Sequence, residues 1–364
     1  MDPEQYLREK AQEVEQQARN IRDAQVFDFN YVPDQPIERQ EMDKLTHAIL
    51  KYEHSHIPTN VFIFGSRGCG KTVTVKFLRH LFNDIHKKTT LLYVNVREYN
   101  TSFKIFAHLL GASPRGLSLS ELFERFRRTY TAPCVLILDE IDFISEKDRG
   151  KEILYLMSRA PENYMLILVA TNPKLLSEVD PMTRSSLGII PLHFHNYDAV
   201  QLVAILDQRA QRGLHTYTPG LLHEISALVT KLTNADVRVA IKTLYYAATD
   251  ETRSVQANFD LAQRDLVSDL LCDLNYNNVL VLKALLRSEE KLAKPVYRQY
   301  LKLCTEKSEK ALAYTRWYNN LSYLQSIGLI LLVSTKVGRT YTNRIDPLFE
   351  ESLLQTAHDQ KLHS

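Results

Sequence analysis

The sequence predicts an α/β protein whose parallel β-sheet lies between two layers of helices and is followed by a helical lid and a C-terminal winged helix. Three observations predict this fold. Between residues 61 and 194, short apolar runs alternate with helical patterns, as in a parallel sheet covered on both faces. From Tyr197 to about Asp269, only amphipathic helical patterns remain. From Leu271 onward, three helical patterns precede a hairpin, the order of elements in a winged helix. We therefore expect domains at residues 1–196, 197–269 and 270–364.

The elements follow in a regular order along the chain. Residues 1–26 predict a polar helix. Pro33 and Pro36 then make an extended lead-in to a helix that begins near Glu38. The expected strands are "VFIF" (61–64), "LLYVNV" (91–96), "VLIL" (135–138), "LILVA" (166–170) and "IIPLHF" (189–194).

The composition is that of a globular protein, with 45% hydrophobic and 24% charged residues in a chain of 364. No apolar run approaches the roughly 18 residues that span a bilayer, and the polar N-terminus is unlike a signal or transit peptide. Four scattered cysteines fit a reducing cytosol. We therefore expect a cytoplasmic protein. The histidine pairs His54/His56 and His193/His195 do not show the spacing of a metal site.

The charge is unevenly distributed. The net charge is only +2, yet residues 279–344 carry twelve Lys or Arg and four Asp or Glu, a local balance of +8. This basic C-terminal region predicts an anionic partner at that end of the chain.

A glycine-rich turn follows the first expected strand. "GSRGCGKT" (65–72) matches the pattern G-x-x-x-x-G-K-[ST] between a strand and a helix, the context that a phosphate-binding loop requires. The glycines bring backbone N–H groups close to an anion, and the helix N-terminus adds partial positive charge. We expect Lys71 to reach the β- and γ-phosphates of ATP and Thr72 to ligate Mg²⁺. A loop that merely turns the chain is the alternative.

Adjacent carboxylates end the third expected strand, "VLILDEID" (135–142). Acids at the end of a buried strand are costly unless they meet a cation. We expect Asp139 to hold Mg²⁺ and Glu140 to orient the attacking water. The alternative is a pair of acids that caps the following helix.

Three further polar residues are candidates for the same site. Asn172 ends the strand "LILVA" and could hydrogen-bond the γ-phosphate or the water, although a strand-end Asn is often a turn residue. Arg184, after a proline turn, could act on a neighbouring protomer's nucleotide, or it is simply solvated. Arg238 in the lid could reach back to the nucleotide and report its state.

Taken together, these motifs resemble those of the AAA+ ATPases, and specifically of the archaeal replication initiators related to the origin recognition complex and cell-division-cycle-six proteins. The resemblance covers nearly the whole chain. It is carried by "NYVPDQPIERQEMDKL", "GSRGCGKT", "VLILDEID", "VATN", "MTRSSLG", "HFHNYDAVQLVAILDQRAQRGL" and "NADVRVAIKTLYYA", together with the terminal winged helix. Two departures stand out: the second arginine of the lid motif is replaced by Val239, and the loop carries Arg67 and Cys69.

The resemblance implies further residue roles. Val32 and Pro33 would line the adenine pocket, and Tyr197, Arg209 and Arg238 would contact the nucleotide. Residues 98–118 occupy the place of an insertion that touches DNA in the initiators. The full set expected to bind ATP or ADP is Val32, Pro33, Gly68, Cys69, Gly70, Lys71, Thr72, Val73, Tyr197, Arg209 and Arg238.

The third helix of the expected winged helix places polar side chains opposite an apolar face. Tyr314, Trp317, Leu321 and Leu324 lie at core spacing, and Arg and Asn on the other face suit contacts to guanine and adenine edges. The hairpin tip adds basic residues that could enter a minor groove. A protein-binding winged helix is the alternative, although the +8 balance favours DNA. The expected DNA contacts are Arg316, Asn319, Asn320, Tyr323, Lys336 and Arg339.

The leading hypothesis is a slow ATPase, used as a switch, that binds double-stranded origin DNA. By its resemblance it would act beside the nucleoid, recruit the replicative minichromosome maintenance helicase and meet paralogous initiator subunits on DNA. Two other hypotheses remain: a motor that loads helicases or clamps mainly through protein contacts, and a transcriptional regulator with a vestigial nucleotide site. Intact Lys71, Thr72, Asp139 and Glu140 argue against a vestigial site.

Overall fold

The computed structural model describes residues 3–111, 113, 116–131, 133–145, 148, 151–162, 164–233, 235–250, 252–337 and 340–355. The chain forms two compact units. One comprises Ile21–Leu222 and Thr230–Arg238. The other comprises Met1–Asn20, His223–Val229 and Val239–Ser364. The domain boundaries expected at 196/197 and 269/270 stay a prediction.

The first of these units is built on a five-stranded parallel sheet, as the alternating pattern predicts. All five expected strands are present, and their order across the sheet is β2-β3-β4-β1-β5. β1, which leads into the glycine-rich turn, is therefore paired on both sides, with β4 and β5. The strands are β1 (Val61–Phe64), β2 (Thr90–Asn95), β3 (Cys134–Asp139), β4 (Met165–Ala170) and β5 (Ile190–His193).

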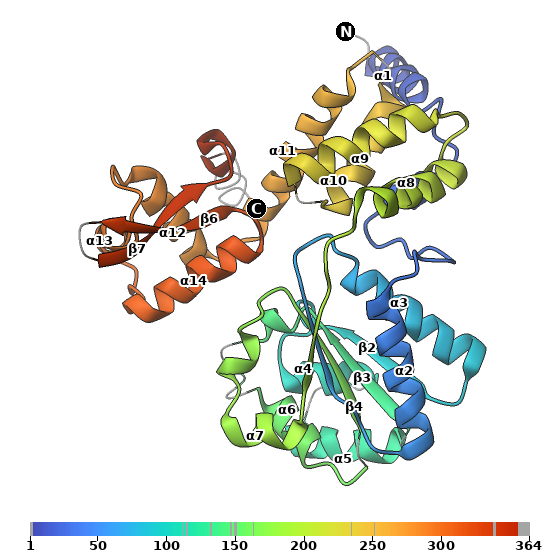
Figure 1. Ribbon diagram of the computed structural model, residues 1–364, viewed down its shortest axis with the longest axis vertical. Helices are drawn as coiled ribbons and strands as arrows, with labels where there is room; N and C mark the ends of the chain where they lie inside the picture. Colours follow the sequence, from blue (N-terminus) through green and yellow to red (C-terminus); the bar gives the residue numbers. More distant parts are fainter. Residues whose placement is uncertain are drawn as a thin grey trace. The chain divides into compact units, whose positions relative to one another are not determined.

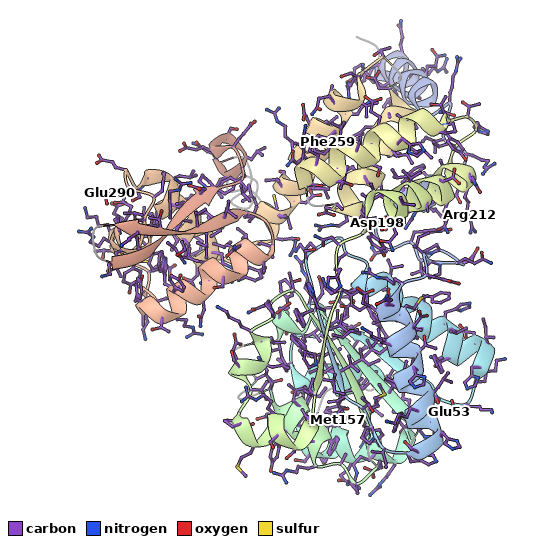
Figure 2. All side chains as sticks on the ribbon, viewed as in Figure 1. Glu53, Met157, Asp198, Arg212, Phe259 and Glu290 are labelled. Atoms are coloured by element: carbon purple, nitrogen blue, oxygen red, sulfur yellow. The ribbon has the colours of Figure 1, made fainter. Side chains whose placement is uncertain are left out.

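Helices cover both faces of this sheet and complete three layers (Figure 1). Because side chains alternate along a strand, Val135 and Ile137 pack on one side, with α2 (Gln40–Ser55) and α3 (Lys71–His80). Leu136 and Leu138 pack on the other side, with helices from the 102–187 region. These helices are α4 (Ser102–Leu109), α5 (Leu119–Thr129), α6 (Glu152–Ser158) and α7 (Pro181–Leu187). Figure 2 labels Glu53 on α2 and Met157 on α6.

The lead-in before α2 packs against the first lid helix, α8 (Ala199–Gly213). A short helical turn, η1 (Ala24–Phe27), lies so close to Gly213 that a Cβ there would meet the Val26 side chain at 2.4 Å. Asp198 caps the first turn of α8 and Arg212 lies in its last turn (Figure 2). Arg212 pairs with Asp34 at 2.7 Å. The segment before α2 is thus fixed by the lid helix.

The other unit contains the remaining helices and the hairpin. Its polar N-terminal helix, predicted over residues 1–26, is shorter than predicted: α1 spans Pro3–Gln17, and residues 24–27 form the separate turn η1. Lid helices α9 (Pro219–Thr233) and α10 (Val237–Thr249) are each divided between the two units, whereas α11 (Val255–Asp273) belongs wholly to this one. No helix among the described residues has both the length and the apolar composition needed to cross a bilayer.

Three helices and an antiparallel hairpin form the C-terminal part, as expected for a winged helix. The helices are α12 (Tyr276–Arg287), α13 (Ala293–Glu306) and α14 (Tyr314–Ser326), and the hairpin strands are β6 (Ile330–Val337) and β7 (Thr340–Pro347). Trp317, Leu321 and Leu324 are buried in their core, as predicted. The prediction for Tyr314 was wrong: it is 39% exposed, because it begins α14 and lies at the edge of the aromatic cluster.

Candidate nucleotide site and nucleic-acid interface

The glycine-rich turn joins β1 to α3 and is closed by the lysine that begins the helix. Gly68 and Gly70 have φ angles of +73° and +87°, which glycine adopts without steric cost. Lys71 is 9% exposed. Its Nζ donates to the carbonyls of Gly65 at 2.8 Å and Ser66 at 2.7 Å. The loop therefore curls around a buried cation that two carbonyl groups hold in place.

A carboxylate from the lid segment lies against this loop. An ideal Cβ on Gly68 would be 2.0 Å from Asp236 Oδ1. Asp236 also accepts hydrogen bonds from the Arg238 side chain, with Nε–Oδ1 at 3.0 Å and Nη2–Oδ2 at 2.5 Å. The expected nucleotide contact Arg238 is thus held beside the loop by an acid to which the sequence analysis gave no role.

Gly68→Ala is expected to weaken ATP binding roughly tenfold or more, because the methyl group collides with Asp236 and the left-handed backbone resists a side chain. Gly116→Ala is the matched control: Gly116 has φ +78°, but no atom lies within 4 Å of the position that a Cβ would take there. Calorimetric titration of both variants with ATP measures the effect. Equal affinities in the two variants would contradict the steric explanation.

Asp139 ends β3 as a buried carboxylate, 1% exposed. The Tyr93 hydroxyl donates to its Oδ2 at 2.9 Å. Burial raises the pKa of Asp139, against hydrogen bonds from Thr72 and Tyr93. A carboxylate that is costly to ionise and lies beside a threonine hydroxyl and Lys71 suits a divalent cation. Thr72 and Asp139, the pair expected to hold Mg²⁺, therefore come together and fit that ion.

Glu140 follows directly and has an unusual backbone. Its φ and ψ are 54° and 40°, a left-handed conformation that costs a non-glycine residue about 1–2 kcal/mol. Such strain persists where the surrounding structure imposes it, often at functional sites. The left-handed conformation turns the chain at the carboxyl end of β3, the position expected for the acid that orients the attacking water.

Asp142 links the acid strand to the next strand. It accepts hydrogen bonds from the backbone N–H of Thr171 at 2.5 Å and of Asn172 at 3.3 Å, and burial raises its pKa to about 6. The Asn172 Oδ1 accepts from the Lys174 N–H at 2.9 Å, as in a turn. Asp142 therefore positions Asn172, a role that only spatial proximity of the two strand ends reveals.

The remaining expected nucleotide contacts lie around the loop and the lead-in. The Tyr197 hydroxyl lies at Gly70, 2.1 Å from an ideal Cβ there. Arg209 is buried, stacks 4.4 Å from the Tyr31 ring centroid and donates to the Val26 carbonyl. It thereby fixes the segment that carries Val32 and Pro33, both half-buried. Arg184 is exposed on α7, as a role toward a neighbouring protomer would require.

The sequence analysis missed Arg39, which is 8% exposed beside the loop. Its guanidinium pairs with Glu41 at 2.9 Å and donates to the Cys69 carbonyl at 2.6 Å. The one available signal was the Arg-x-Glu spacing at the start of a helix. Burial opposes ionisation of Glu41, but hydrogen bonds from Arg39 and His195 outweigh it and lower the pKa of Glu41 to about 2.

Glu41→Gln is expected to destabilise the fold by up to about 3 kcal/mol at pH 7, at roughly 1.4 kcal/mol per unit of pKa. Because the pKa of Glu41 is lowered in the folded protein, this contribution is present above the usual glutamate pKa and is lost as pH falls toward 2. Urea unfolding of both proteins at pH 7 and pH 3 measures it. A difference in unfolding free energy that grows toward acid would contradict the assignment.

Cys69 lies inside the phosphate-binding loop between Arg67 and Lys71, a setting in which a thiol is either reactive or an inert packing residue. Its side chain is 1% exposed, and an ideal Cβ on Gly65 would lie 3.1 Å from its Sγ. This burial favours the packing role.

The C-terminal domain presents the expected polar face. Arg316 and Asn319 are exposed on α14, Asn320 and Tyr323 are half-buried, and Lys336 is exposed on β6. Arg339 lies outside the described residues. A groove of about 520 Å³ adds basic and aromatic residues that the sequence analysis did not expect to contact DNA. Its lining includes Lys294 and Arg298 on α13, Tyr314 and Tyr318 on α14, and Thr342 and Asn343 on β7.

The segment 98–118 contributes to the core of the sheet domain. Within it, α4 buries Ile105, Phe106 and Ala107 against the sheet. Lys104 and His108 are exposed. Contact with DNA by this segment stays a prediction, and in α4 it could involve only such outward side chains.

Comparisons with known proteins agree with this architecture. A model of the AAA domain family matches residues 56–177. The chain is 29% identical over 343 residues to the ORC1-type DNA replication protein 1 of Sulfolobus acidocaldarius, covering 85% of each chain. It is 25% identical over 361 residues to the ORC1-type DNA replication protein 2 of Archaeoglobus fulgidus, covering 93% of each.

Solved structures show the same fold. The Aeropyrum pernix ORC1 protein in complex with DNA matches with a TM-score of 0.69 at 23% identity, over 94% of this chain and 98% of that one. The ADPNP-ADP complexes of the Aeropyrum pernix ORC2 protein match with a TM-score of 0.58 at 22% identity, over 95% and 100%. The AAA domain, the lid and the C-terminal domain thus occur together in these proteins as in this chain.

Proposed function

We propose that this chain, a homologue of the archaeal ORC1/Cdc6-type replication initiators along 85–93% of its length, is an ATP-switched initiator that binds origin duplex DNA and recruits the replicative minichromosome maintenance helicase. The observation that carries the proposal is an intact nucleotide site in a chain with this homology. Lys71 and Thr72 begin the helix that follows β1, and Asp139 and Glu140 stand at the carboxyl end of β3, with β4 between these two strands in the sheet.

The residues divide the work of ATP hydrolysis between binding and water activation. The loop amides and Lys71 bind the β- and γ-phosphates, while Thr72 and Asp139 hold Mg²⁺. When bound, the ion neutralises charge on the phosphate oxygens. Glu140 orients the attacking water, and Asn172, positioned by Asp142, donates its amide to the γ-phosphate or the water.

Hydrolysis is slow in this proposal and serves to change the state of the protein. Arg238 leaves Asp236 for the nucleotide when phosphate is present and returns to Asp236 when it is lost, which is supported by their ion pair beside Gly68. Arg184, exposed on α7, acts on the nucleotide of a neighbouring subunit on DNA. The nucleotide state thereby sets whether the helicase is received.

Duplex DNA is bound through α14 and the hairpin. Arg316 and Asn319 meet base edges or adjoining phosphates, whereas Lys336 and Arg339 contact phosphates or the minor groove. The groove beside the hairpin supports the same face, because Lys294 and Arg298 line it. The +8 balance of residues 279–344 supplies the electrostatic attraction.

Asn319→Ala is expected to cost about 1–3 kcal/mol on the preferred duplex, with little effect on random DNA, because it removes a base contact. Lys336→Ala is expected to weaken both duplexes alike and to flatten the dependence of log K on log salt by roughly one unit. Binding isotherms on both duplexes across a salt series measure these effects.

Arg253→Ala is the control for the DNA experiment, since Arg253 lies outside the basic region 279–344 and is paired with Asp250 at 3.0 Å. It should leave the affinity for both duplexes near that of the wild type. If Lys336→Ala lost only specific binding and Asn319→Ala bound DNA as the wild type does, the roles assigned to the hairpin and to α14 would be contradicted. The outward residues of α4 would then be better candidates for sequence readout.

Genome-wide mapping of the bound protein tests the proposed function. Peaks confined to replication start sites are expected. Peaks at promoters would favour the regulator instead. The absence of specific footprints, with retained binding to helicase or clamp subunits, would favour a loader that acts through protein contacts.

A further inference from the structure

We infer that Arg39 is a positioning residue of the nucleotide site, which fixes the orientation of the phosphate-binding loop and ties it to the segment that enters the lid. The inference rests on the proposed binding of ATP. It adds to that site a residue thirty positions before Cys69, in neither the glycine-rich turn nor the acid strand.

The guanidinium of Arg39 is anchored from three segments at once. Nη1 donates to the Cys69 carbonyl at 2.6 Å, and Nη2 donates to the His195 carbonyl at 2.8 Å. Nε and Nη2 donate to the two carboxylate oxygens of Glu41 at 2.9 and 3.0 Å. A buried arginine with this many bonds is held rigidly. Its position is therefore set by the fold and does not depend on solvent.

The bond to Cys69 acts on the loop through the geometry of the peptide group. In a trans peptide, the C=O of one residue and the N–H of the next point in opposite directions. Anchoring the Cys69 oxygen on Arg39 therefore directs the Gly70 N–H away from Arg39. Lys71 holds the Gly65 and Ser66 carbonyls in the same loop. The loop binds phosphate through its amides, so carbonyl anchors of this kind decide where those amides point.

Arg39 also contacts the chain that connects β5 to the lid. Its guanidinium carbon lies 4.9 Å from the Phe194 ring centroid and 4.7 Å from that of Tyr197. The Tyr197 hydroxyl in turn lies against Gly70. One cation thus touches the loop and the aromatic residue that leads into α8.

Lysine cannot reproduce this arrangement. Its single ammonium group lacks the planar fork that reaches two carbonyls and a bidentate carboxylate together. Arg39→Lys should therefore keep the charge and lose most of the positioning. Arg39→Ala removes both.

The test compares full-length wild type, Arg39→Ala, Arg39→Lys and Arg79→Ala, where Arg79 is an exposed arginine on α3. Calorimetric titration with ATP at 25 °C gives Kd, and steady-state hydrolysis gives KM and kcat. Arg39→Ala is expected to raise Kd and KM roughly tenfold or more, with kcat at saturating ATP within about threefold of wild type. Arg39→Lys should raise Kd at least threefold, and Arg79→Ala should match the wild type.

A melting curve without nucleotide separates positioning from a merely structural role. If Arg39→Ala melts earlier yet binds ATP with a Kd within twofold of wild type, the inference is overturned. If Arg39→Ala does not fold, the same criterion is applied to Arg39→Lys: an ATP Kd within twofold of the wild type overturns the inference. A third outcome is that the wild type and both Arg39 variants bind ATP equally well while Lys71→Ala does not bind it. This outcome would contradict the role of Arg39 and leave the proposed function standing. A wild type that did not bind ATP would remove both.

Discussion

Lys71→Ala is expected to abolish measurable nucleotide binding, with a loss of affinity of roughly a hundredfold or more. The variant loses charge-assisted contacts to the phosphates, each worth about 1.5–3 kcal/mol. It also loses the bonds by which Nζ holds the Gly65 and Ser66 carbonyls, so the loop is no longer closed. Calorimetric titration with ATP and with ADP measures the loss.

Lys88→Ala provides the matched control for this variant, because Lys88 is an exposed lysine of the same unit. It should bind ATP as the wild type does. Retained affinity in Lys71→Ala would mean that the glycine-rich turn does not receive the phosphates.

Glu140→Gln is expected to keep ATP bound and to lower turnover by roughly 10²–10⁴-fold, since the amide preserves the side-chain shape but cannot activate water. Glutamine should tolerate the left-handed backbone of Glu140 as glutamate does. Single-turnover hydrolysis together with an ATP Kd measures both quantities. An equal loss of binding in Glu140→Gln and Lys71→Ala would contradict the separate roles of these residues.

Glu152→Gln, at the exposed start of α6, makes the same chemical change away from the strand end and should leave turnover unaltered. A drop in its rate to that of Glu140→Gln would show that loss of an acid anywhere on this domain slows hydrolysis, and the water-orienting role would fall.

Much of the fold follows from local patterns in the sequence. The apolar runs predicted all five strands of the sheet, because buried parallel strands leave a continuous apolar signal. The sequence also predicts that Lys71, Thr72 and Asp139 lie close together, because they follow parallel strands whose carboxyl ends meet at one edge of the sheet. Tyr314 was misplaced because helical spacing gives the face of a residue but not where the core ends along the helix.

The parts that sequence reasoning missed depend on contacts between distant residues. Arg39 binds carbonyl oxygens of Cys69 and His195, and every residue has a carbonyl, so no side-chain pattern marks them as partners. Asp142 likewise acts on backbone N–H groups of the next strand. Asp236 is identified by its approach to Gly68 and by its ion pair with Arg238. The fold determines which atoms interact in these contacts, and the amino-acid sequence contains no pattern that identifies them.

The place of β1 within the sheet has a consequence for how chemistry and signalling are related. Its two neighbouring strands lead to different parts of the site: Asn172 follows β4, whereas Tyr197 and the first lid helix, α8, follow β5. The strand that carries the phosphate loop thus has two different neighbours. On one side, β4 leads to the residue proposed to contact the γ-phosphate, and on the other, β5 leads to the lid. Under the proposed function, a substitution on the β4 side would therefore change ATP hydrolysis, whereas one on the β5 side would change the response of the lid to the bound nucleotide.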